Sequence, residues 1–111
     1  MLETVRAYGG MTTASHHLAA RAGARVLADG GNAVEAAVAM AAAIAVVYPH
    51  MNSIGGDNFW LIHRPGEAPI AIDACGASAQ AADLDFYAGQ EKIPSRGATA
   101  ALTVAGAVSG W

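Results

Sequence analysis

The sequence has 111 residues, 54% of them hydrophobic and only 14% charged, so it forms one small domain or part of a larger one. A chain this short has much surface to cover when it stands alone, and we expect so apolar a chain to bury surface against something else. The net charge of −3 provides no basic surface for nucleic acid. The single cysteine, Cys75, excludes an intrachain disulfide and a cysteine metal cluster.

The N-terminal residues contain no apolar segment of the kind found in a secretory signal. This favours a cytoplasmic location and no membrane partner. Residues 11–14 suit either a short strand or the entry to a helix. Ser15 is a suitable N-cap, and residues 16–28 follow as an amphipathic helix. Arg25 and Asp29 are spaced to form an ion pair on this helix.

The most distinctive stretch follows a glycine pair. Asn32 is a good N-cap, Glu35 lies where the helix dipole favours a carboxylate, and Pro49 ends the segment. The alanine-rich run predicts a helix over residues 33–47 that is apolar on every face and therefore buried on every side. The uncharged run is shorter than the ~20 residues that a bilayer requires, so a buried central helix is the better interpretation.

A β-hairpin is predicted next. Residues 59–63 are bulky on both faces, which is typical of an interior strand. Residues 64–67 form a turn signal with proline second and glycine third. Residues 69–73 read as the returning strand, and we expect this hairpin to dock on the two helices.

The C-terminal third gives weaker signals. The residues after Asp73 read as a loop. Asp83 is a candidate cap for a short helix over residues 84–90, and residues 98–104 suit a strand. Trp111 as the last residue indicates a chain that is cut rather than finished.

No pattern of chemistry-bearing residues declares an activity. Residues 53–56 could cradle an anion, but they are too short for a nucleotide fingerprint and a tight turn is favoured. Cys75 lacks the local signature of a nucleophile, and nothing near Thr12 would activate its hydroxyl. His16 and His17 are adjacent and cannot share a metal from one helix face. A non-catalytic structural or interaction module therefore stays open.

A resemblance to a known family gives more. The sequence GGNAVEAAVA at residues 30–39 resembles the signature near the start of the large subunit of gamma-glutamyltransferases. Residues 10–19, 47–56 and 104–110 resemble its flanking segments in the same order. The resemblance covers nearly the whole chain.

The resemblance implies an α/β (α+β) fold: part of the four-layer αββα sandwich of N-terminal-nucleophile hydrolases, here a helical hairpin plus a β-hairpin. Residues 1–111 would be the N-terminal segment of the large subunit, an incomplete domain. Members are made as proenzymes that act in glutathione metabolism and transfer or hydrolyse an acyl group through a threonyl ester. The catalytic threonine begins the small subunit, so no catalytic residue is expected in this chain.

The partners implied are the rest of the large subunit, the small subunit and a small amide substrate, with no cofactor or metal. The family's D-F-R-E motif supplies an arginine that clamps the substrate carboxylate. Here that stretch is Asp73-Ala74-Cys75-Gly76, so Cys75 and Gly76 are the expected substrate-binding residues. A thiol cannot make the bidentate contact of arginine. This weakens the inference to a gamma-glutamyl substrate, and a divergent amide hydrolase or acylase fits as well. Two further departures are His17 and Ala105, where the family has proline.

Overall fold

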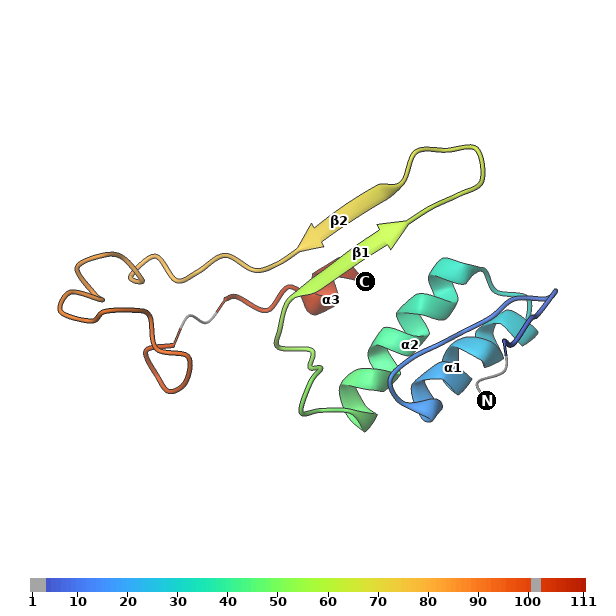
Figure 1. Ribbon diagram of the computed structural model, residues 1–111, viewed down its shortest axis with the longest axis horizontal. Coiled ribbons are helices and arrows are strands. Elements are labelled where there is room, and N and C mark those ends of the chain that lie inside the picture. Colours follow the sequence, from blue (N-terminus) through green and yellow to red (C-terminus); the bar gives the residue numbers. More distant parts are fainter. Residues whose placement is uncertain (1–3, 101–102) are drawn as a thin grey trace. The chain divides into compact units, whose positions relative to one another are not determined.

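The computed structural model describes residues 4–100 and 103–111. The chain divides into two compact units, Met1–Ser53 and Ile54–Trp111, which we call unit 1 and unit 2 (Figure 1). The expectation that the β-hairpin docks on the helices concerns the relation between the units and stays a prediction. Among the described residues, no helix combines the length and the apolar character needed to cross a bilayer.

Unit 1 is a helical hairpin of α1 (His17–Ala28) and α2 (Ala33–Val47), as predicted. The contact between the helices is made by small residues, with Ala19 and Gly23 buried on α1 and Ala36 buried on α2. A Cβ at Gly23 would lie 2.6 Å from Cγ of Met40. The absence of a side chain at this position therefore allows the helices to approach closely.

The start of α1 differs from the prediction by one residue. His16, not Ser15, is the N-cap: its backbone is extended, and its ring Nδ1 accepts a hydrogen bond from the Leu18 amide at 3.2 Å. The predicted ion pair is confirmed, with Arg25 Nε 2.8 Å from Asp29 Oδ2. Residues 11–14 form no strand, so this segment is the entry to the helix.

The bounds of α2 are those predicted. The Asn32 side chain accepts hydrogen bonds from the amides of Val34 and Glu35 at 2.9 and 3.0 Å, and the Glu35 carboxylate accepts from the Asn32 amide at 2.7 Å. This is a complete capping box. The expectation of burial on every side is not met within unit 1, because α1 covers one side and Val46 remains 77% exposed.

Unit 2 contains the antiparallel hairpin of β1 (Asn58–Ile62) and β2 (Ile70–Ala74), paired from Asn58↔Ala74 to Ile62↔Ile70. The predicted hairpin is confirmed. β1 begins one residue earlier than predicted, and β2 begins one residue later than predicted. The predicted turn is present: the Glu67 amide donates to the Arg64 carbonyl at 3.0 Å. Gly66 has a φ of +83°, which suits the third position of this turn.

The two faces of the hairpin differ. The four-residue helix α3 (Ala107–Gly110) packs on both strands. A Cβ at Gly110 would lie 2.8 Å from Asn58 Oδ1, so the helix backbone lies directly against the start of β1. On the opposite face Phe59 and Leu61 are 67% and 77% exposed. The expectation that both faces of this strand are covered is therefore wrong within unit 2.

The segment between β2 and α3 is irregular. Asp83 Oδ1 accepts from the Phe86 amide at 2.8 Å, as a cap would, but residues 84–90 form successive turns rather than the predicted helix. The predicted strand over residues 98–104 is also wrong in its described part. Thr103 makes a single bridge to Ser78, and residues 97–100 form a turn. Residues 101–102 of that prediction lie outside the described residues.

Candidate functional site

Three segments of unit 2 meet beside one end of the hairpin: residues 56–57, residues 75–78, and residues 103–107, which end on the first residue of α3. The first precedes β1 and the second follows β2. Because the first residue of β1 pairs with the last residue of β2, Asp57 and Cys75 become neighbours across the sheet. We call this meeting point the junction.

Asp57 connects the three segments of the junction. Its Oδ1 accepts a hydrogen bond from the Thr103 hydroxyl at 2.7 Å and one from the Gly76 amide at 3.2 Å. The Thr103 hydroxyl, the Gly76 amide and the Cys75 thiol lower the pKa of Asp57, in that order of importance. Asp57 is therefore a carboxylate at neutral pH, since hydrogen bonds to the charged form favour it.

Cys75 is exposed, and its amide donates to Asp73 Oδ1 at 2.9 Å. Its Sγ lies 3.7 Å from the Gly76 carbonyl oxygen. The pKa of the thiol is raised, first by the neighbouring Asp57 carboxylate, then by partial desolvation and by the charges of Asp57 and Asp73. The reactive form of cysteine is the thiolate, so this environment does not suit a nucleophile.

Close backbone contacts fix the junction. A Cβ at Gly76 would collide with the Val104 carbonyl, and a Cβ at Gly106 with the Ala74 carbonyl. The Gly56 carbonyl accepts from the amides of Gly106 and Ala107 at 3.0 and 2.9 Å. Neither Gly76 nor Gly106 has a positive φ, so the requirement for glycine here is one of space.

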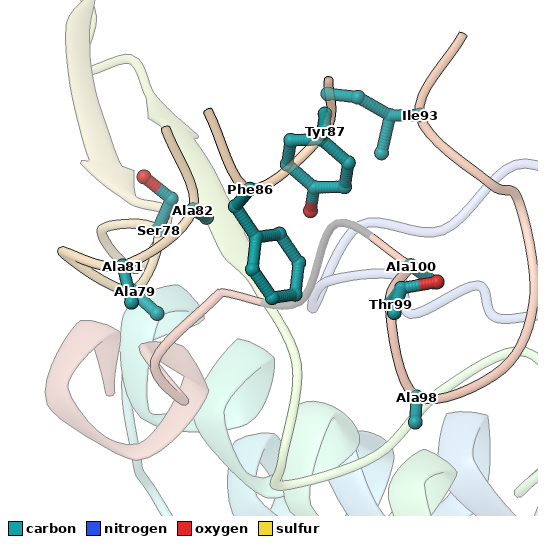
Figure 2. A pocket seen from close by; sticks show the side chains of 10 residues that line it. All are labelled: Ser78, Ala79, Ala81, Ala82, Phe86, Tyr87, Ile93, Ala98, Thr99 and Ala100. Carbon is teal, nitrogen blue, oxygen red and sulfur yellow. The ribbon is translucent and has the colours of Figure 1, made fainter. Parts of the chain in front are cut away.

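A separate cavity of about 330 Å³ lies in the irregular part of unit 2. Figure 2 shows the rings of Phe86 and Tyr87 pointing into it, with Thr99 across from them. Its lining consists of Ser78, Ala79, Ala81, Ala82, Phe86, Tyr87, Ile93, Ala98, Thr99 and Ala100. Because none of these side chains is a carboxylate, imidazole, thiol or cation, the cavity offers apolar surface rather than acid–base chemistry.

The other candidate residues from the sequence have structural roles. Gly56 presents a carbonyl oxygen to its neighbours, whereas an anion cradle presents amide hydrogens. The Thr12 hydroxyl donates to the Ala20 carbonyl at 2.8 Å. His16 caps α1, and its ring stacks on His17 with centroids 4.7 Å apart. In the described part of the chain, no three His, Cys, Asp or Glu residues are placed to hold a metal ion.

Asp57 was missed by sequence reasoning. Its partners Gly76 and Thr103 lie 19 and 46 residues further along the chain, so no local spacing points to them. The only local signal is its place, between a glycine pair and the first residue of a strand.

Comparison with known proteins defines the class. The family model described as Gamma-glutamyltranspeptidase matches residues 19–111. Over 97% of this chain, the crystal structure of gamma-glutamyltranspeptidase from Helicobacter pylori superposes with a TM-score of 0.84 at 33% identity, and the match covers 32% of that chain. The enzyme from Pseudomonas nitroreducens complexed with L-DON gives a TM-score of 0.78 at 33% identity, covering 95% of this chain and 33% of that one. The chain belongs to the gamma-glutamyltranspeptidase family, and its α+β architecture is part of the N-terminal-nucleophile hydrolase fold.

The curated relatives are more specific. The chain is 63% identical to an oxamate amidohydrolase proenzyme of Klebsiella pneumoniae over 102 residues, which are 92% of this chain and 19% of that protein. It is 46% identical to the glutathione hydrolase-like YwrD proenzyme of Bacillus subtilis over 91% of this chain and 19% of that protein. The chain thus spans about a fifth of the length of these relatives. The resemblance found in the sequence is confirmed, and these relatives are proenzymes.

Proposed function

We propose that this chain is the N-terminal part of the large subunit of an amide hydrolase whose substrate is a short amide such as oxamate. The observation that carries this proposal is the 63% identity to an oxamate amidohydrolase proenzyme. The residues at the junction support it, since Cys75 and not an arginine follows β2.

The proposed chemistry is acyl transfer from the amide to a threonine and then to water. The threonine and its oxyanion donors would come from the small subunit, with the rest of the large subunit completing the pocket. The Asp73 side chain accepts from the Cys75 amide two residues on, which makes an Asx turn that Gly76 follows; we call it the Cys75–Gly76 turn. In this chain that turn would face the acyl part of the substrate. A neutral thiol there supplies neither the charge nor the two parallel hydrogen bonds by which arginine binds a carboxylate.

The test compares kcat/KM of the processed full-length enzyme for oxamate and for gamma-glutamyl-p-nitroanilide. Losing a charge-assisted contact costs about 1.5–3 kcal/mol, so kcat/KM for the gamma-glutamyl compound should be roughly ten- to a hundredfold lower than in an enzyme that carries the arginine. Cys75→Arg should improve the gamma-glutamyl substrate, whereas Cys75→Ser, which adds no charge, should not. A strong preference of the wild-type enzyme for the gamma-glutamyl compound would instead favour a glutathione hydrolase and refute the proposal.

A further inference from the structure

The junction carries negative charge that no ion pair neutralises among residues 4–100 and 103–111. The ion pairs found there are Arg25–Asp29 and Arg64–Glu67, and neither involves the junction. Asp57 and Asp73 both lie beside the Cys75–Gly76 turn, where they accept hydrogen bonds from its two backbone amides. The turn is therefore flanked by two carboxylates.

The Asp57 carboxylate is fixed more firmly than a surface carboxylate usually is. The Thr103 hydroxyl and the Gly76 amide both donate to its Oδ1, at 2.7 and 3.2 Å. These bonds come from two different loops that are packed against each other, with the Val104 amide donating to the Ala77 carbonyl at 2.9 Å. Rotation of the side chain would break both bonds, so the negative charge stays at the turn.

The same hydrogen bonds lower the pKa of Asp57, and Asp57 in turn raises the pKa of the Cys75 thiol. A substrate group that approaches Cys75 would therefore meet an S–H beside a fixed carboxylate. A neutral or apolar group would meet no charge repulsion there. A second carboxylate is repelled, because like charges a few ångströms apart raise each other's energy even in water.

We propose that Asp57 is a specificity-determining residue that fixes the Cys75–Gly76 turn and repels acyl groups with a carboxylate at their far end. This inference rests on the proposed function, because it requires that the turn face the acyl part of the substrate. It also explains how a short anionic amide is admitted. The carboxylate of oxamate is bonded directly to the reacting carbonyl carbon, so it does not extend to the distance of a gamma-glutamyl α-carboxylate.

The experiment uses the processed full-length enzyme and two anilides that differ in one terminal group. Glutaryl-p-nitroanilide ends in a carboxylate and pentanoyl-p-nitroanilide in a methyl group. The wild-type enzyme should prefer the pentanoyl compound. Asp57→Asn keeps an oxygen acceptor for Gly76 and Thr103 but removes the charge, and it should raise the glutaryl-to-pentanoyl ratio of kcat/KM about fivefold.

Salt distinguishes repulsion from a merely structural role. Raising NaCl from about 20 mM to about 500 mM shortens the screening length severalfold, so the glutaryl-to-pentanoyl ratio should rise more in the wild-type enzyme than in Asp57→Asn, where only the Asp73 charge remains beside the turn. The matched control is Asp83→Asn, since Asp83 also accepts a backbone hydrogen bond in unit 2 but outside the junction. Its ratio should equal that of the wild type.

The inference is overturned if the glutaryl-to-pentanoyl ratio of kcat/KM changes neither with salt nor in Asp57→Asn. Failure to hydrolyse the pentanoyl anilide also overturns it, because a turn open to neutral acyl groups is required. If Asp57→Asn does not fold, the salt series on the wild-type enzyme decides alone. Hydrolysis of oxamate is scored separately, so the proposed function can stand while this inference fails.

Discussion

The first turn of α1 depends on the ring of His16, whose Nδ1 accepts a hydrogen bond from the Leu18 amide. His17 then occupies the first helical position, where the amide has no partner within the helix and proline is favoured. The proline that the family resemblance places there is thus replaced without loss of a hydrogen bond.

His17→Pro should stabilise the protein by about 0.4–1 kcal/mol, because proline restricts the unfolded chain more than the folded one. His16 already has φ −131° and ψ 132°, the extended conformation that a following proline requires. The measurement is the midpoint of urea unfolding. Leu18→Pro is the control and should destabilise, since it removes the donor of the cap, and a lower midpoint for His17→Pro itself would contradict this account.

A second prediction at this scale concerns Gly76. Gly76→Ala should destabilise the protein by about 3 kcal/mol or more, because overpacking against backbone cannot be relieved by side-chain rotation. Gly9→Ala is the matched control, since a Cβ there would meet nothing within 4 Å. Thermal unfolding of the two variants tests the pair. Equal midpoints would show that the Val104 backbone moves aside easily.

At the scale of elements, α2 has the strongest local determinants in the chain. Its capping box satisfies three backbone amides at the N-terminus with two side chains. The alanine-rich sequence adds high helix propensity along its length. Its start is therefore fixed by neighbours in sequence.

Asn32→Ala should cost about 1 kcal/mol of stability, within the 0.5–2 kcal/mol range measured for N-caps. The loss reflects the amides of Val34 and Glu35, which lose their acceptor. Circular dichroism during thermal unfolding gives the value. Asn32→Asp keeps the acceptor and should behave like the wild type; a loss as large as that of Asn32→Ala would point to a cause other than capping.

These local determinants explain which elements could be predicted. Three features follow from residues within four positions of one another, and the sequence predicts each of them. They are the bounds of α2, the turn at Arg64–Glu67 and the Arg25–Asp29 ion pair. The segment over residues 84–90 carried a good cap, but it has a positive φ at Gly89 and forms only turns. The junction could not be predicted, because the pairing of β1 with β2 brings Gly76 to Asp57, while Thr103 comes from a segment 46 residues away.

At the scale of the whole molecule, the exposed apolar side chains are the main feature. On α2, Val46 is 77% exposed. On β1, Phe59 is 67% exposed and Leu61 is 77% exposed. Each lies on a face that its own unit leaves open. We expect these open faces to contact other protein, since the relatives are about five times as long as the chain.

The 111-residue chain produced by itself should therefore self-associate and should not hydrolyse amides. Size-exclusion chromatography over a range of concentrations tests the first expectation, and ammonia release from oxamate tests the second. The processed full-length enzyme is the positive control. Turnover by the short chain that is abolished in Thr12→Ala or Cys75→Ala would show that catalytic groups lie within it.

The environment of Cys75 also makes it a chemical reporter. It is the single cysteine of the sequence, and alkylating agents react with the thiolate alone. Because Asp57 raises the thiol pKa, iodoacetamide should modify Cys75 slowly at neutral pH and faster as the pH rises. In Asp57→Asn the same reaction should already be faster at neutral pH. The rate of alkylation would thus report the charge beside this turn without any substrate bound.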